Sequence, residues 1–192
     1  MSNAAVSALN GATVQGFARV EEMGLQGMIT LRGDLASDKV KKAVKEATGQ
    51  DIPATRTINA GEGGAVAWMS PDELLIMVGY DSVTDTLAAI ETALQGEHFL
   101  AVNVSDARAM FRVTGTGGGV REALAKLCPV DMTPGEFEPG MFRRSRMAQI
   151  PAAIWMPDAE TVQIVCFRSV AEYTFNLLRD AVAEGGEVGL FS

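Results

Sequence analysis

The chain has 192 residues and a mass of 20.3 kDa, enough for one large domain or two small ones, and its hydrophobic content of 47% is that of a globular protein. Twenty-four acidic residues against 16 Lys and Arg give a net charge of −8, which argues against a nucleic-acid partner. No apolar run reaches the roughly 18 residues of a membrane span, the N-terminus lacks a secretion signal, and the two cysteines form no CxxC pair, so we expect a cytoplasmic protein.

The first segment, residues 1–26, is rich in Ala, Ser, Asn and Gly and shows no sustained hydrophobic period. Such a segment cannot bury enough apolar surface to offset the cost of ordering it. We therefore expect a flexible N-terminal arm, or an arm that becomes ordered only against a partner.

Residues 27–97 form a first predicted unit. It contains a strand, a helix, a short strand, a hairpin and a second helix, expected at 27–33, 34–48, 55–59, 65–78 and 81–94. Ser37 is placed to cap the first helix and Gly49 to end it.

Residues 98–184 form a second predicted unit, followed by a C-terminal tail at 185–192. Its strands are expected at 99–104, 109–114 and 141–149, its hairpin at 152–165, and its helices at 120–127 and 170–182. Cys128 and Cys166 fall in apolar surroundings, where cysteine usually acts as a small buried hydrophobe.

The two hairpins are copies of each other. Trp68 and Trp155 are each followed by Met and by a turn with Pro and Asp, at an offset of 155 − 68 = 87 residues, and Ser82-Val and Ser169-Val repeat that offset at the start of a helix. The pattern predicts an internal duplication of strand-helix-hairpin-helix units. We expect an α+β fold, with helices on one face of an antiparallel or mixed sheet. The two units either share one sheet or pack as two lobes.

No stretch of the chain carries a complete active site. The turn Thr114-Gly-Thr-Gly-Gly-Gly-Val120 has neither the G-x-G-x-x-G spacing nor the Lys of a phosphate loop, and His98 is the sole histidine, so neither a dinucleotide site nor a multi-histidine metal site is predicted. The acidic pairs Asp72-Glu73 and Asp158/Glu160 sit at hairpin tips, where turn chemistry explains them better than acid–base catalysis. We predict no catalytic, cofactor-binding or metal-binding residue.

The densest basic cluster consists of Arg143, Arg144 and Arg146 on one predicted strand. Alternation along a strand puts Arg144 and Arg146 on one face and Arg143 on the other. Such a strand suits an acidic partner surface or an anionic ligand, and is equally compatible with an ordinary exposed strand.

A series of ordered motifs between about residues 27 and 182 resembles the gamma subunit of heterotetrameric sarcosine oxidase. The motifs are Trp68-Met-Ser-Pro-Asp-Glu-Leu-Leu75, Val104-Ser-Asp-Ala-Arg108, Leu127-Cys-Pro-Val-Asp-Met132, Phe137, Gly140 and Arg168-Ser-Val-Ala-Glu-Tyr173. The resemblance implies a fold similar to the folate-binding domain of aminomethyltransferase, an α+β fold with a ferredoxin-like duplication, which agrees with the repeat described above.

The resemblance also implies a complex that demethylates sarcosine oxidatively, with tetrahydrofolate as the one-carbon acceptor. The catalytic groups of this complex are then on other chains. The resemblance implies FAD and FMN on the beta subunit, the tetrahydrofolate site and NAD on the alpha subunit, and zinc on the delta subunit. The chain itself is then a non-catalytic subunit with an assembly role, and alpha is its direct contact. The alternatives are a stand-alone folate-binding or one-carbon transfer protein of the same fold, and a free-standing homo-oligomeric scaffold.

Overall fold

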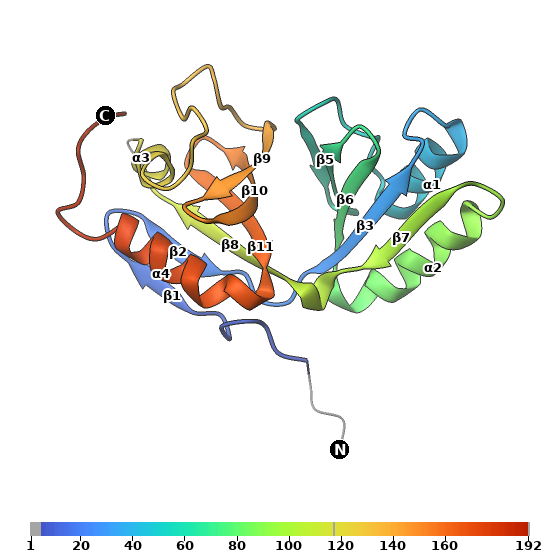
Figure 1. Ribbon diagram of the computed structural model, residues 1–192, viewed down its shortest axis with the longest axis horizontal. Helices are drawn as coiled ribbons and strands as arrows, with labels where there is room; N and C mark the ends of the chain where they lie inside the picture. The colour runs from blue at the N-terminus through green and yellow to red at the C-terminus, as the bar shows by residue number, and fades with distance from the viewer. Residues whose placement is uncertain (1–4, 117, 192) are drawn as a thin grey trace. The chain divides into compact units, whose positions relative to one another are not determined.

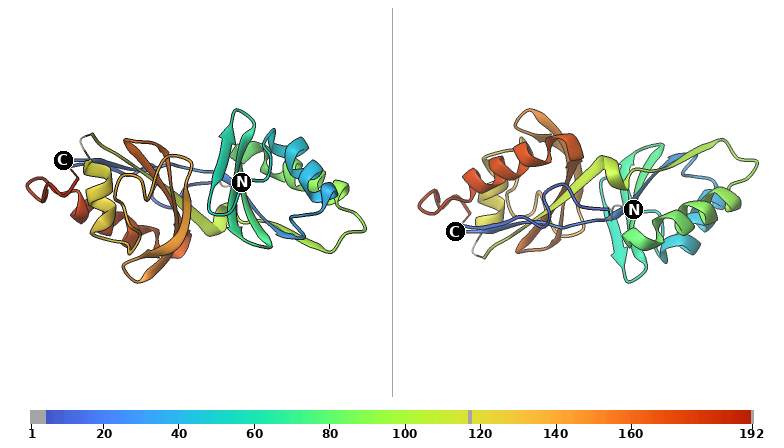
Figure 2. Two further views of the ribbon diagram at one scale, coloured as in Figure 1. Left: turned by 90° about the horizontal axis from the view of Figure 1, so that it is seen from above. Right: turned by 90° about the horizontal axis from the view of Figure 1, so that it is seen from below.

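The computed structural model describes residues 5–116 and 118–191 (Figure 1). The described chain divides into two compact units. The central unit is Gln26–Asp106, and the terminal unit combines the segment up to Leu25 with the segment from Ala107 onwards. Each unit has its own antiparallel sheet, and both views in Figure 2 show the helices of a unit on one side of its sheet. The predicted α+β class is confirmed, and the two units do not share a sheet.

The central unit is a five-stranded sheet in the order β4-β5-β6-β3-β7. Its strands are β3 (Gly27–Gly33), β4 (Ile58–Gly61), β5 (Gly64–Ser70), β6 (Glu73–Val78) and β7 (Phe99–Asn103), and its helices are α1 (Asp38–Thr48) and α2 (Val83–Ala93). Alternate residues of β3 and β6, such as Ile29, Leu31 and Ile76, pack with Val44 and Ile90 of the helices into one core.

Helix α1 shows how local sequence sets these elements. Val40, Ala43 and Val44 recur at helical spacing and are buried, and Gly49 ends the helix in a left-handed conformation with φ 71°. Ser37 occupies the N-cap position as predicted, but its side chain makes no capping hydrogen bond. The helix begins at Asp38, four residues later than the sequence pattern suggests.

The terminal unit is a six-stranded sheet in the order β1-β2-β8-β11-β10-β9. Its strands are β1 (Thr13–Gln15), β2 (Arg19–Glu22), β8 (Arg108–Thr114), β9 (Phe142–Met147), β10 (Ile150–Asp158) and β11 (Thr161–Phe167), and its helices are α3 (Gly119–Ala125) and α4 (Ala171–Ala181). Phe111, Ile154 and Ile164 of the sheet pack with Leu124 and Leu178 of the helices. Burial of such side chains, about 1.5–3 kcal/mol each, holds the helices on the sheet.

The duplicated hairpins are β5-β6 and β10-β11. Both lose regular pairing directly after the tryptophan, between Trp68 and Ser70 in one and between Trp155 and Asp158 in the other. Each is followed by a short 3-10 turn and then by a helix, α2 or α4. The turn and bulge of the hairpin are therefore repeated together with the Trp-Met sequence.

Each sheet contains one strand whose next neighbour along the chain belongs to the other sheet. Strand β2 precedes β3 in the chain but pairs with β8, and β7 precedes β8 but pairs with β3. Both junctions are antiparallel, so β2 and β7 occupy equivalent positions in the two sheets. For this reason the compact unit continues to Asp106, whereas the predicted first repeat ends at residue 97.

The predicted flexible arm needs correction for its described part. Strands β1 and β2 join the six-stranded sheet, and Val20 of β2 is fully buried. The buried carboxylate of Glu22 accepts hydrogen bonds from the Ser7 hydroxyl (2.8 Å) and the Gly11 backbone N–H (2.7 Å), which fixes the segment before β1. The arm is ordered because it completes a sheet, a long-range cause that local composition does not report. Residues 1–4 lie outside the described residues.

The C-terminal tail is also held in place. The buried Glu122 carboxylate accepts hydrogen bonds from the backbone N–H groups of Val188 (2.5 Å), Gly189 (2.9 Å) and Leu190 (3.4 Å). Lys126 donates to the carbonyls of Ala181 (3.1 Å) and Gly186 (2.7 Å). Glu122 of α3 and Lys126, directly after that helix, thus anchor the described part of the tail predicted at 185–192.

We expect the Glu122 contact to make the tail sensitive to acid. The Val188 N–H, with those of Gly189 and Leu190 and the charge of Lys126, lowers the pKa of Glu122 below its usual value of 4.5. A lowered folded-state pKa contributes stability that is present above the unfolded pKa and is lost as the pH falls through the folded one. Glu122→Gln should release the tail at neutral pH, and the wild type should release it only below about pH 4.5.

Heteronuclear NOE values of the Val188–Leu190 amides measure this release. Glu187→Gln, which removes the same charge from the exposed part of the tail, is the matched control and should leave the tail rigid. Equal NOE values in wild type, Glu122→Gln and Glu187→Gln would contradict the anchoring role.

Candidate functional site

The arginine cluster lies on β9, the edge strand of the six-stranded sheet. Arg143 is paired with Ile154 of β10, whose side chain is in the core, so Arg143 lies on the helix side of the sheet. Arg144 and Arg146 alternate with it and are exposed on the opposite side. The structure therefore separates the three arginines in the way that strand alternation predicts.

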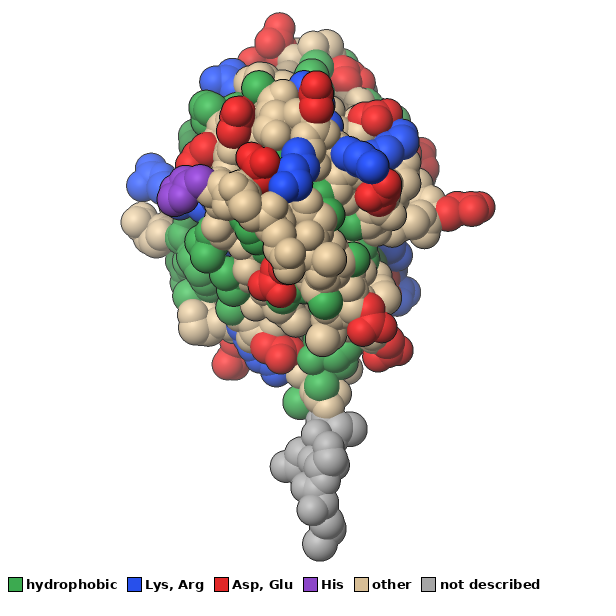
Figure 3. All heavy atoms as spheres, turned by 90° about the vertical axis from the view of Figure 1, so that its right-hand side faces the viewer, with side chains coloured by type: hydrophobic (Ala, Val, Ile, Leu, Met, Phe, Trp, Pro, Cys, Tyr) green, Lys and Arg blue, Asp and Glu red, His purple; other side chains and the backbone are tan. Residues whose placement is uncertain are grey.

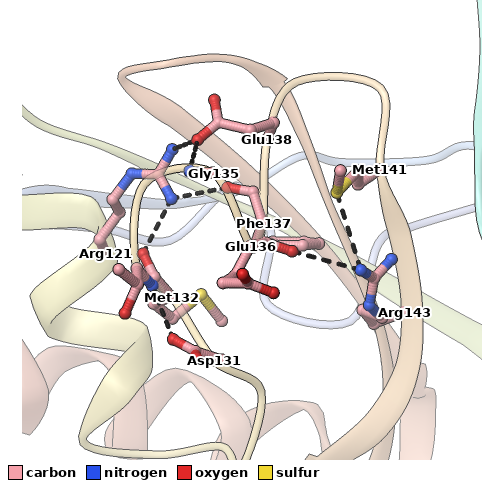
Figure 4. A network of polar contacts seen from close by, with 10 residues as sticks. Arg121, Asp131, Met132, Gly135, Glu136, Phe137, Glu138, Met141 and Arg143 are labelled. Carbon is pink, nitrogen blue, oxygen red and sulfur yellow. Dashed lines mark hydrogen bonds and ion pairs between the residues drawn. The ribbon is translucent and has the colours of Figure 1, made fainter.

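Arg143 is engaged by the loop that precedes β9. Its guanidinium lies 5.5 Å from the ring centroid of Phe137 and donates hydrogen bonds to the carbonyls of Phe142 (3.0 Å) and Glu136 (3.4 Å), as Figure 4 shows in part. The side chain is half-buried. Arg143 thus ties the loop to the strand, and the exposed part of the cluster is Arg144 with Arg146.

Arg121 holds the same loop from the other side. Its Nη1 donates to the carbonyls of Met132 (2.8 Å) and Phe137 (2.6 Å), and its Nη2 lies 3.2 Å from Oε1 of Glu138, which also accepts the Gly135 N–H (Figure 4). The arginine is only 6% exposed. A planar guanidinium with several fixed donors can close a loop in this way, and a lysine cannot. Sequence reasoning missed Arg121, although a charged residue among the apolar positions of the 120–127 helix was a signal.

Ring stacking supports β9 on the face that also carries Arg144 and Arg146. Phe142 at the start of β9 stacks on Trp155 of β10 with ring centroids 5.8 Å apart, and both residues are buried. The two aromatic side chains fix β9 against its neighbour at the point where the loop enters it. Arg144 and Arg146 are therefore presented on a rigid edge.

The acidic pairs behave as turn residues. The Ser70 hydroxyl donates to Asp72 (2.6 Å) and, with the nearby charge of Arg32, lowers the pKa of that exposed carboxyl. Asp158 accepts the backbone N–H of Glu160 (2.9 Å) within its own turn. A general acid would need a raised pKa, so the Asp72 environment opposes that role.

The glycine-rich turn is covered by the tail. A Cβ on Gly118 would meet the backbone of Phe191, and one on Gly119 would contact the ring of Phe17. Gly117 lies outside the described residues. The turn therefore serves close packing of the chain termini, and α3, with seven residues, is a short helix.

The remaining candidates are structural or exposed. His98 is exposed just before β7. Burial raises the pKa of the Cys128 and Cys166 thiols, which keeps them protonated and unreactive.

Within residues 5–116 and 118–191, no group of three or more His, Cys, Asp or Glu is placed to hold a metal ion. In the same ranges, no helix combines the length and apolar character that crossing a membrane requires.

Comparison with known proteins agrees with the motif series. Residues 32–184 match the model of the sarcosine oxidase, gamma subunit family. The chain belongs to this family. The sarcosine oxidase subunit gamma of Corynebacterium sp. strain U-96 is 28% identical over 187 residues, which cover 96% of this chain and 85% of that relative.

Two solved structures resemble the fold. A chain of the heterotetrameric sarcosine oxidase from Corynebacterium sp. U-96 matches with a TM-score of 0.78 at 26% identity, covering 88% of this chain and 87% of that one. The aminomethyltransferase T of the Bartonella henselae glycine cleavage system matches with a TM-score of 0.59 at 12% identity, covering 85% and 46%. The first match supports a subunit role for members of the gamma family, and the second concerns the fold alone.

We expect the Arg121 network to be required for the loop that supports β9. Arg121→Met keeps the aliphatic stem but leaves the Met132 and Phe137 carbonyls without these donors, which should lower the free energy of unfolding by about 2–4 kcal/mol. Urea denaturation measures the loss. Arg146→Met, on the exposed side of β9, is the control and should stay within about 0.5 kcal/mol of wild type. An equally small effect of both substitutions would show that the network is dispensable.

Proposed function

We propose that this gamma-family chain is an assembly subunit of a heterotetrameric sarcosine oxidase that contributes binding surface and no catalytic group. The observation that carries the proposal is the family match over residues 32–184. The geometry is consistent with it, since Arg121, Arg143, Glu122 and Asp72 all serve loops, turns or the tail. The partners in this proposal are the alpha, beta and delta subunits, with alpha in direct contact.

In the same proposal the cofactors lie on the other subunits. FAD, FMN, NAD, tetrahydrofolate and zinc are expected there, and the complex demethylates sarcosine oxidatively with tetrahydrofolate as the one-carbon acceptor. This chain then stabilises the complex by presenting rigid strands to its neighbours.

Strand β9 is one proposed contact. Arg144 and Arg146 place two exposed positive charges on a rigid edge of a molecule whose net charge is −8. Charges of this kind steer association with an oppositely charged surface and set its orientation. An acidic patch on the alpha subunit is the expected counterpart.

Co-expression tests the assembly role directly. The alpha, beta and delta subunits, expressed with and without this chain, should form a complete and active complex only when it is present. Full assembly and activity in its absence would refute the proposal.

A salt-dependent association measurement tests the β9 contact. Arg144→Gln with Arg146→Gln should slow association with the other three subunits by about tenfold at low ionic strength, and the difference should shrink at high salt. Lys41→Gln with Lys42→Gln, which removes the same charge from exposed positions of α1, should leave the rate within about twofold. Equal rates for the two double variants would remove β9 from the interface.

A stand-alone folate-binding protein is the competing function, favoured by the fold that the chain shares with an aminomethyltransferase. Calorimetric titration of the isolated chain with tetrahydrofolate separates the two. The assembly proposal expects no saturable binding at micromolar concentrations.

A further inference from the structure

Strand β7 is an edge strand that lacks the usual protection of such edges. Edge strands in natural proteins are kept short or carry charges, because their free backbone groups would otherwise recruit another strand. Among the other edges, β1 has three residues, β4 has four, and β9 carries three arginines. The sequence of β7, Phe99-Leu-Ala-Val-Asn103, is longer than the first two and has no charge or proline.

The first four side chains of β7 are apolar, and they lie on both faces of the strand. Phe99 and Ala101 pack against the core of the central unit. Leu100 and Val102 point to the other face and are 52% and 40% exposed. Figure 3 shows hydrophobic side chains gathered next to the chain's single histidine, His98, which directly precedes this strand. Leu100 and Val102 therefore expose apolar side chains along the open edge.

The register shows which backbone groups are available there. The Val104 N–H donates to the Met28 carbonyl (2.8 Å), and the paired positions continue as Val102 with Thr30 and Leu100 with Arg32. In an antiparallel ladder, hydrogen-bonded pairs alternate with pairs whose backbone groups point outward. The N–H and C=O groups of Phe99, Ala101 and Asn103 therefore face away from β3.

The duplicated half of the molecule shows what such an edge can hold. Strand β2 lies beside β8 as β7 lies beside β3, and β1 covers the outer edge of β2 through the pairs Thr13–Glu21, Val14–Val20 and Gln15–Arg19. Within the described residues, no strand pairs with the outer edge of β7. The equivalent position in the central unit is an unfilled strand site.

We propose that β7 is a docking site for an extended segment of another subunit, which adds to the five-stranded sheet as a sixth strand. This inference rests on the proposed function. The segment would be uncharged along its length, with apolar residues beside Leu100 and Val102 and main-chain bonds to residues 99, 101 and 103. A second copy of this chain is a poorer occupant, because two molecules of net charge −8 repel each other.

Two variants test the side chains and the backbone separately, both within the co-expressed four-subunit complex. Leu100→Lys with Val102→Lys replaces the exposed apolar pair, and Val188→Lys with Leu190→Lys makes the same change at tail positions that are 74% and 64% exposed. Ala101→Pro removes the outward N–H and leaves the bonds of Leu100 and Val102 to β3, but it also enlarges a side chain that packs against the core. Ala101→Ser keeps the outward N–H. Thermal unfolding of each isolated chain verifies that it folds.

Retention of the variant chain in the purified complex is the measurement. We expect Leu100→Lys/Val102→Lys and Ala101→Pro each to weaken association by about tenfold or more, and the two controls to stay within about twofold of wild type. Wild-type retention of all variants would overturn the docking site while leaving the proposed function intact. Failure of the wild-type chain to enter any complex would overturn both. A dimer of the isolated chain that Ala101→Pro abolishes would overturn the choice of occupant.

Discussion

The structure depends on the exchange of one strand between the two repeats. Because β2 pairs with β8 and β7 pairs with β3, each sheet contains a strand from outside its predicted repeat, 98–184 for the first pairing and 27–97 for the second. The β2–β8 pairs join residues 89–95 positions apart (114 − 19 = 95, 111 − 22 = 89), and the β3–β7 pairs join residues 66–74 positions apart (103 − 29 = 74, 99 − 33 = 66). These pairings form only after a long loop is closed, at a cost that grows slowly with the length of the loop. The same exchange gives order to the N-terminal arm and leaves β7 as an edge.

The exchange also explains where sequence reasoning succeeded and where it failed. The hairpins around Trp68 and Trp155, the helices that follow them and the left-handed stop at Gly49 depend on neighbouring residues, and the sequence predicts them well. Composition predicts that residues 13–22 belong to a flexible arm, because no local pattern stabilises them. Their order comes from β8 and from Glu22, partners that no hydrophobic period reveals.

In the candidate site, too, the sequence predicts the local features and misses those that depend on distant residues. Alternation placed Arg144 and Arg146 on one face, since that is a property of any strand. That Arg143 would be engaged by the loop, and that Arg121 would be buried beneath it, depends on how residues 131–141 fold back over α3. The polar groups of the loop, the tail and the hairpin turns are engaged within the fold. In the proposals made above, the chain binds its partners through two edge strands, the basic β9 and the apolar β7.

The alternation of amide exchange along β7, compared between the free chain and the four-subunit complex, tests this account most directly. In the free chain the N–H groups of Leu100 and Val102 are bonded to β3, and those of Phe99, Ala101 and Asn103 face outward. A strand added in the complex should slow exchange at 99, 101 and 103 by about tenfold or more and change it little at 100 and 102. Unchanged exchange at the three outward amides would contradict the account.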